Sequence, residues 1–362
     1  MKYIIIYTFS CLRKISAVLT FIIIANCTPD QYNLSSGELI IFLDREAGYS
    51  HLYTSQHIKE MSLLDFSLRM KKDFSDQDLD CVRTQYNIFL EQQVKNWAEY
   101  EKIYLLDRLE VVADQLGRLN TRFFPDTLLM ISTTGRQEFK AFYTTGNAIV
   151  FPKYVKLYAG LLRWVSPLQH QLESLLAHEL FHIYTTNHSY SRNDLYSLVG
   201  FSPIDSLQVT GLESLLITNP DDKGINYRIS LINDSTGQEE DLMLLITSKF
   251  TTWVGYNKFP TRISVLFGYM EPKLIKIEQG QAAWQPEKNN NGSFILSNPN
   301  DWLGFTEKTG INASSAISPE EILAHHFENL IKMLWEPDYP ENLTSREVEI
   351  LMALEEAIRP TP

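Results

Sequence analysis

The sequence predicts an α+β fold, because helical and strand patterns occupy separate stretches of the chain. From about residue 76 to 119 apolar residues recur with the spacing of a helix, whereas residues 127–151 hold short strand candidates broken by glycines. Residues 200–310 are rich in strand and loop patterns and lie between two helical stretches. Such segregated runs of helices and strands are typical of α+β proteins.

Composition places the chain among ordinary globular proteins. It has 362 residues, of which 44% are apolar and 21% charged, which excludes a disordered or collagen-like chain. This length fits one large domain or two fused lobes. The 32 basic and 44 acidic residues give a net charge of −12, so we expect no nucleic-acid partner.

Residues 1–27 have the pattern of an export signal. Basic residues precede an apolar run from Ile15 to Ala25, which is too short for a membrane-spanning helix of about 20 residues. The run ends in Ile24-Ala25-Asn26-Cys27, which is similar to a bacterial lipobox, although Asn26 departs from the usual small residue. We expect a lipid anchor at Cys27 as the membrane contact and a location at the bacterial cell envelope. Ordinary secretory cleavage and an uncleaved anchor are the alternatives.

Beyond this segment, residues 28–50 are predicted to be a tether and residues 51–362 a single folded domain. Its first part, residues 51–120, is predicted to be mainly helical, with a possible strand at Met61–Met70. Strands are then expected at three places, Thr127–Ser132, Glu138–Thr145 and Ala148–Phe151. Residues 125–200 and a later helix at residues 318–335 carry the motifs described next.

The strongest signal is His178-Glu179-Leu180-Phe181-His182, an H-E-x-x-H match. Ser166 followed by Pro167 and Gln169 fits the start of a helix that runs to about Tyr184. On that helix, apolar residues lie along one side: Leu168, Leu172, Leu176 and Ile183. The motif is therefore predicted to be helical, which is the context that it needs.

The helix brings the motif residues into a usable geometry. His178 and His182 are one turn apart, so both rings can bind one zinc ion at about 2.0–2.1 Å. Glu179 lies about 100° further round, in the apolar sector, where a buried carboxylate costs several kcal/mol unless a cation compensates it. We expect Glu179 to be the catalytic base that accepts a proton from water at the open position of the metal.

The third ligand is expected from the helix that begins near Ser318. On this helix Glu321, His325 and Glu328 share one face. With these residues and the H-E-x-x-H helix, the sequence resembles the gluzincin metallopeptidases, the group that includes thermolysin. The resemblance implies a two-lobed, zincin-like fold with the motif helix against a small mixed sheet. It also implies that Glu321 binds zinc. In gluzincins an acidic residue four positions on supports a zinc-bound histidine, but this chain has His325 there, which departs from the pattern.

Two alternatives stay open for the third ligand. Ser318-x-x-Glu321 is also a capping box, in which Glu321 only satisfies a backbone N–H group. Glu213 is a second candidate ligand, at a spacing that gluzincins also use. Glu320 is expected to serve the helix N-terminus electrostatically.

The resemblance implies two further features of a cleft. An edge strand would pair with an extended substrate, and Gly146–Val150 is the candidate, with an ordinary core strand as the alternative. A donor to the developing oxyanion is expected from Tyr227, with His188 and His326 as alternatives. With the runs Leu195–Phe201 and Ile217–Asp222 and with Tyr227, the chain also resembles a group of bacterial exported proteins that have the same motif helix, over about residues 125–335.

The sequence therefore predicts a zinc metallopeptidase with His178, His182 and Glu321 as ligands of one Zn²⁺ and with peptide or protein substrates. Two other classes remain. One is a non-catalytic surface lipoprotein with a structural zinc site, which has four ligands and no open position. The other is a zinc hydrolase of a non-peptide amide.

Overall fold

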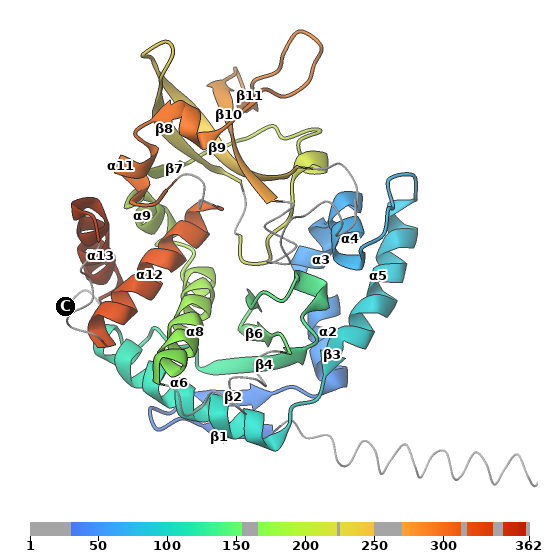
Figure 1. Ribbon diagram of the computed structural model, residues 1–362, viewed down its shortest axis with the longest axis vertical. Coiled ribbons are helices and arrows are strands. Elements are labelled where there is room, and N and C mark those ends of the chain that lie inside the picture. Colours follow the sequence, from blue (N-terminus) through green and yellow to red (C-terminus); the bar gives the residue numbers. More distant parts are fainter. Residues whose placement is uncertain are drawn as a thin grey trace, which may run out of the picture.

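The computed structural model describes residues 30–153, 166–222, 225–249, 270–312, 317–335 and 343–359. The signal peptide and the lipid anchor predicted for residues 1–27 lie outside these residues. Within the described ranges, no helix has both the length and the apolar character needed to cross a membrane. Two sheets and the helices around them make up the described molecule (Figure 1).

The first sheet is mixed, and its centre is a parallel trio. β4 (Thr127–Thr133) pairs in parallel with β2 (Leu39–Phe42) on one side and with β6 (Ala148–Phe151) on the other. The outer strand β1 (Asp30–Asn33) pairs antiparallel with β2, and the outer strand β5 (Tyr143–Thr145) pairs antiparallel with β6. The short β3 (Val94–Lys95) pairs antiparallel with β4. The strand order β1-β2-β4-β6-β5 leaves β5 at an edge.

Helices cover both faces of this sheet, because its central strands are apolar on both sides. In β6, Ile149 and Phe151 face one core, and Ala148 and Val150 face another. The first core includes α6 (Glu99–Leu119) and α8 (Ser166–Asn187). The second includes four shorter helices, α2 (Arg45–Tyr53), α3 (Gln56–Glu60), α4 (Leu63–Met70) and α5 (Leu79–Gln93). Burial on both faces is typical of parallel strands.

The second sheet is antiparallel and has the order β11-β10-β9-β8-β13. Its strands are β7 (Phe201–Pro203), β8 (Tyr227–Asn233), β9 (Glu239–Ser248), β10 (Met270–Gln279), β11 (Trp284–Pro286), β12 (Leu296–Ser297) and β13 (Trp302–Leu303). Along β9, Leu242 and Leu244 join the main core, whereas Met243 and Leu245 join a separate small cluster. This alternation is that of a strand with two different faces.

The C-terminal helices connect the two sheets. α12 (Pro319–Trp335) packs along α8, and α13 (Ser345–Ile358) packs on α12 (Figure 1). Phe123 is stacked between Tyr184 of α8 and Phe327 of α12, with ring centroids 4.5 and 4.9 Å apart. Two shorter helices flank the second sheet in the sequence: α9 (Arg192–Ser197) precedes β7, and α11 (Phe305–Thr309) follows β13. The α8–α12 pair is thus closely packed, and the candidate site lies on these two helices.

The α+β prediction is confirmed, while the zincin-like fold stays a prediction. The helical region from 76 to 119 is divided into α5 and α6 by β3. The predicted tether at residues 28–50 is wrong, because β1, β2 and the start of α2 belong to the fold. Ile40 and Phe42 of β2 are 0% and 2% exposed, and β2 pairs directly with the central strand β4.

Two predicted strands are also corrected. Met61–Met70 forms α4 because Ser62 and Asp65 make a capping box that starts a helix. The predicted strand Glu138–Thr145 is reduced to β5, because Arg136–Glu138 form a 3-10 turn (η1) and Phe139 and Lys140 have left-handed backbone angles. A left-handed residue cannot continue a strand.

Candidate metal site

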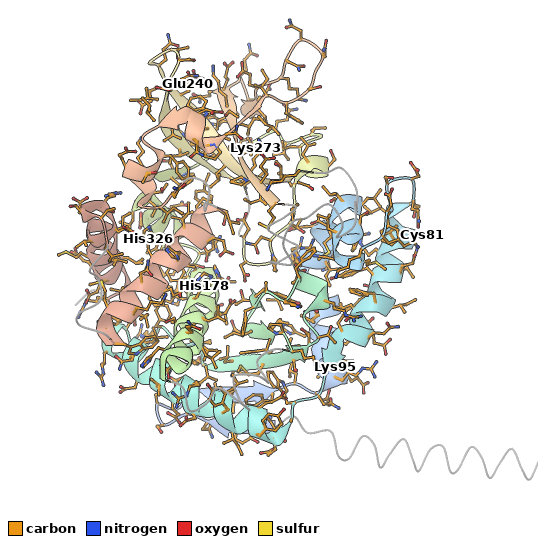
Figure 2. The ribbon with its side chains drawn as sticks, in the orientation of Figure 1. Cys81, Lys95, His178, Glu240, Lys273 and His326 are labelled. Atoms are coloured by element: carbon orange, nitrogen blue, oxygen red, sulfur yellow. The ribbon has the colours of Figure 1, made fainter. Side chains whose placement is uncertain are left out.

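Two histidines of α8 face the N-terminal end of α12. His182 is fully buried and the His178 side chain is 17% exposed, and their ring centroids lie 4.8 Å apart. Figure 2 shows His178 near the middle of the molecule, where α8 runs beside α12. The spacing of four residues puts the two rings on one side of the helix, as the sequence predicts.

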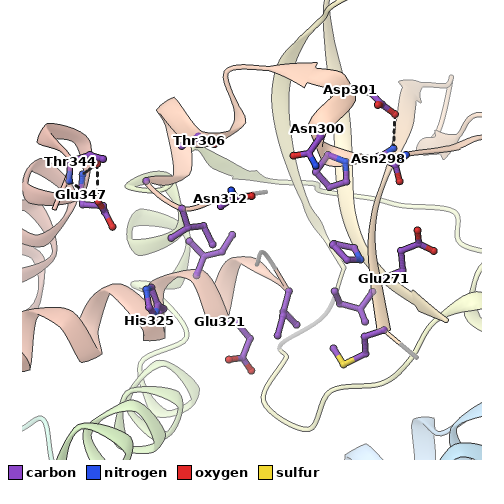
Figure 3. Close-up of a pocket in the computed structure, with 18 of the residues that line it drawn as sticks. Glu271, Asn298, Asn300, Asp301, Thr306, Asn312, Glu321, His325, Thr344 and Glu347 are labelled. Carbon is purple, nitrogen blue, oxygen red and sulfur yellow. Dashed lines mark hydrogen bonds between the residues drawn. The ribbon is translucent and has the colours of Figure 1, made fainter. Parts of the chain in front are cut away.

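Glu321 completes a group of three possible ligands. Its carboxylate points from the first turn of α12 toward α8 (Figure 3). Glu321 Oε2 lies 3.4 Å from His178 Nε2 and 3.9 Å from His182 Nε2, and the three ligand atoms lie within 4.8 Å of one another. A tetrahedral zinc ion with bonds of about 2.0–2.1 Å separates its ligand atoms by about 3.3 Å.

The donor set fits a divalent cation in a second respect. His182 Nε2 is buried, and within the described part of the chain it has no hydrogen-bond partner. A buried nitrogen without a partner costs free energy unless something binds it. Two imidazoles and one carboxylate are the ligands of many catalytic zinc sites. The residues present therefore suit zinc.

The carboxylate of Glu321 is held from its other side. Asn219 Nδ2 donates to Glu321 Oε1 at 2.7 Å, which leaves Oε2 facing the histidines. The backbone N–H of Glu321 donates to Ser318 Oγ at 3.3 Å, so Ser318 does cap the helix. Only half of the predicted capping box forms, because the Glu321 carboxylate is directed at α8. Glu213, the alternative ligand, lies in the 3-10 turn Glu213–Leu215 (η3), and its side chain is outside the described residues.

Glu320 is a site residue that the sequence reasoning missed. It lies in the first turn of α12, as expected, but it is fully buried and its side chain has further partners. Its Oε1 lies 2.9 Å from His182 Nδ1 and accepts from Thr185 Oγ1, and its Oε2 accepts from the Tyr196 hydroxyl. Carboxylates commonly orient a metal-binding histidine through its second nitrogen. The signal was in the sequence: Glu320 falls on the buried stripe of α12 with Leu323 and Phe327.

The outer nitrogen of His178 has weaker support. Glu328 Oε2 lies 3.8 Å from His178 Nδ1, beyond hydrogen-bond distance, and Glu328 pairs with Lys332 at 2.6 Å. His325, at the supporting position that the resemblance implies, contacts Asn329 instead, at 3.3 Å. The two histidines thus differ: His182 has a close carboxylate behind it and His178 does not.

Charges around the site favour a cation. Burial opposes protonation of His182, yet Asp221, Glu321 and Glu320 together raise the pKa of His182 to about 10. Burial likewise opposes ionisation of Glu321, but the neighbouring His182 and His178 and the hydrogen bond from Asn219 lower the pKa of Glu321 to about 2. The site without metal therefore holds a proton on His182 against an ionised Glu321. A metal ion would displace that proton.

Two adjoining cavities share His178 and Glu321 in their walls. Glu179 is 3% exposed and lines a small cavity of about 150 Å³ together with His178, Glu321 and Asn219. A larger cavity of about 1140 Å³ also contains His178 and Glu321 in its wall. It extends from α12 to β10 and to the turn that carries Asn298 and Asp301 (Figure 3). A ligand in the larger cavity could thus reach the three-residue group.

The three candidate oxyanion donors lie away from this group. The Tyr227 hydroxyl donates to Asn193 Oδ1 at 3.0 Å, and Tyr227 lines neither of the two cavities. His188 Nδ1 lies 3.0 Å from the carbonyl of Tyr184, and His326 Nε2 lies 2.7 Å from the carbonyl of Thr309. The catalytic role of Tyr227 stays a prediction without a supporting contact.

The predicted substrate-pairing strand Gly146–Val150 is wrong, because β6 lies between β4 and β5 and both of its edges are paired. Strand β5 forms the edge next to the site. The backbone N–H of Thr144 in β5 donates to Asp221 Oδ1 at 2.7 Å, so this N–H group is already engaged and cannot pair with a substrate strand.

Comparison of the chain with protein-family models, with curated proteins and with solved structures gives no match. The functional argument therefore depends on the geometry of the site.

Proposed function

We propose that this protein is a zinc-dependent hydrolase of peptide bonds, related in its ligand set to the gluzincins. The observation that carries the proposal is the convergence of His178, His182 and Glu321, from two packed helices, with Glu179 lining the adjoining cavity. Each of the four residues belongs to the pattern that the resemblance implies, and their side chains lie together although the two helices are far apart in sequence.

Each residue has a distinct task in this proposal. The three ligands would hold Zn²⁺, which supplies a Lewis acid that polarises a carbonyl and lowers the pKa of water. Glu179, buried beside His178, would accept the proton from the attacking water and deliver it to the leaving amine. Glu320 would keep His182 oriented, because it binds the Nδ1 side of the ring and leaves Nε2 directed at the metal position.

The larger cavity supports access by a molecule of substantial size. Its volume of about 1140 Å³ slightly exceeds the roughly 300–1,000 Å³ of small-molecule sites. Peptide or protein substrates at the bacterial cell envelope, reached through the export signal predicted for residues 1–27, are our proposal for its setting. A non-peptide amide would use the same residues.

The test is zinc content together with hydrolysis by the Glu179→Gln variant. Purified protein beginning at residue 28 should bind one zinc per chain. Glu179→Gln keeps the shape of the side chain but removes the base, so it should retain zinc and lose about 10²–10⁴-fold in hydrolysis of a peptide library. Glu173→Gln, a buried glutamate of the same helix that pairs with Arg108, is the matched control and should keep its activity.

Two results would contradict the proposal. Wild-type protein that takes up no zinc after metal reconstitution would exclude the metal site. Unchanged hydrolysis by Glu179→Gln would exclude Glu179 as the base, and zinc without any hydrolysis in the wild type would favour a structural site.

A further inference from the structure

Residues 216–222, here called the crossing segment, run between the two sheets beside the site. At one end, Leu216 forms a bridge with Thr247, and the Ile217 N–H donates to the carbonyl of Ile246 in β9 at 2.9 Å. At the other end, Asp221 Oδ1 accepts from both the backbone N–H and the hydroxyl of Thr144 in β5, each at 2.7 Å. The segment is therefore fixed to both sheets.

The middle of the crossing segment is fixed by a buried ion pair. In α4, Arg69 Nη1 lies 2.7 Å from Asp65 Oδ1, and the two side chains are 1% and 0% exposed. Asp65 Oδ1 accepts from the N–H of Thr218 at 2.9 Å, and Arg69 Nη2 donates to the carbonyl of Thr218 at 2.8 Å. Both backbone groups of one residue are thus held by one pair of charges.

Such a pair is costly to bury unless its remaining groups are satisfied. Arg69 Nε donates to Glu138 at 2.8 Å, which provides a second carboxylate for the guanidinium. Glu138 is also buried and lies 3.0 Å from His57. Replacing a buried ion pair by apolar residues of similar volume is often neutral in stability, so stability alone does not account for these charges. Their role is to fix the backbone at Thr218.

The next residue, Asn219, contacts the proposed ligand. Its Nδ2 donates to Glu321 Oε1 at 2.7 Å, and its Oδ1 accepts from the N–H of Asp221 at 3.2 Å. The second contact orients the amide so that the NH₂ group faces Glu321. With Oε1 engaged, the oxygen of Glu321 that lies nearest to the two histidines is Oε2.

We propose that Asn219, anchored by the Asp65–Arg69 pair, is a positioning residue of the metal site: it occupies one oxygen of Glu321, so that Glu321 binds the cation through the other oxygen alone. The inference depends on the proposed function, because it takes Glu321 to be a ligand. A carboxylate that binds through both oxygens would fill the position that a catalytic zinc site keeps open. Asn219 would therefore keep open the coordination position that the proposed hydrolysis requires.

The test uses Co²⁺ in place of zinc, because the visible spectrum of cobalt reports its coordination number and four-coordinate cobalt absorbs more strongly than five-coordinate cobalt. At saturating Co²⁺, Asn219→Ala and the similarly sized Asn219→Leu should both absorb more weakly than the wild type, since Glu321 becomes free to bind through both oxygens. Asn300→Ala, in the wall of the larger cavity, is the matched control and should keep the wild-type spectrum. Thermal unfolding of the metal-free variants shows whether they fold.

Each outcome is informative. Folded Asn219→Ala and Asn219→Leu with wild-type spectra would overturn the inference and leave the metal site standing. A wild type that binds no Co²⁺ or Zn²⁺ would instead overturn the proposed function.

The anchor is tested separately with Arg69→Lys. A single ammonium cannot reach Glu138, Asp65 and the Thr218 carbonyl together, so the spectrum should change in the same direction but less. If only the Asn219 variants change it, the role of the ion pair is overturned and that of Asn219 remains.

Discussion

Replacing Glu320 by Gln tests how strongly the buried carboxylate behind His182 supports the proposed metal site. Gln has the same shape, and the Tyr196 hydroxyl can turn from donor to acceptor, so the variant removes the charge while the packing stays. A hydrogen bond to a charged group contributes about 1.5–3 kcal/mol and a neutral one about 0.5–1.5 kcal/mol. The difference of about 1–2 kcal/mol corresponds to a loss of roughly 5–30-fold in zinc affinity. Changes in the groups behind zinc ligands commonly cost 10–100-fold, which overlaps this range.

Zinc affinity is measured by competition with a chromophoric chelator at fixed pH and salt. Glu328→Gln is the matched control, because Glu328 lies on the same helix but 3.8 Å from His178 Nδ1 and is paired with Lys332. We expect its affinity to stay within about threefold of wild type, since a partly exposed ion pair contributes little. If Glu320→Gln binds zinc as tightly as the wild type, Glu320 does not act on the metal. Equal losses in both variants would indicate a general effect of charge on α12.

Three further predictions concern ligand identity, pH and the buried ion pair. Glu321→Ala should weaken zinc binding, whereas Ser318→Ala should cost about 1 kcal/mol of stability in urea unfolding and leave zinc affinity unchanged; the reverse pattern would favour the capping interpretation. Because the pKa of His182 is raised from 6.5 to about 10, its proton stabilises the metal-free fold below pH 6.5, and this contribution is lost as the pH rises toward 10. Zinc must displace the same proton, so zinc affinity should rise by up to about tenfold per pH unit in that window, and a pH-independent affinity would contradict the assignment. Arg69→Met should lower the free energy of unfolding by about 3–5 kcal/mol, because it leaves the buried Asp65 carboxylate without its charged partner, and a loss below about 1 kcal/mol would contradict this reasoning.

The sequence could predict the part of the site that lies on one helix. His178, Glu179 and His182 are placed by the period of α8 alone, so their relation follows from local structure. Glu321 required the resemblance to gluzincins, because nothing local distinguishes a ligand from a capping residue. Glu320 could have been identified from its place on the buried stripe of α12, by the same argument that singled out Glu179.

Contacts between distant elements could not be predicted in this way. Asn219 acts through the backbone fixed by Arg69. Arg69 and Thr218 are 149 positions apart in the sequence, and no periodic pattern connects them. The tether prediction failed for a related reason. The short strand β2 becomes part of the sheet through parallel pairing with β4, and such pairing leaves no mark in the sequence around it. Local patterns predicted the fold class, and tertiary contacts decided the topology.

The division of the site between α8 and α12 has a consequence for biosynthesis. The ribosome makes the two histidines of α8 long before it makes Glu320 and Glu321, so a nascent chain that ends before Pro319 carries two of the three proposed ligands and no carboxylate behind His182. We expect a chain that ends at Gly310 to bind zinc far more weakly than the full chain, which a chelator titration of both would measure; equal affinities would contradict it. Metal capture would then be the last event of maturation, and a growing chain would be inactive until its final helices had docked.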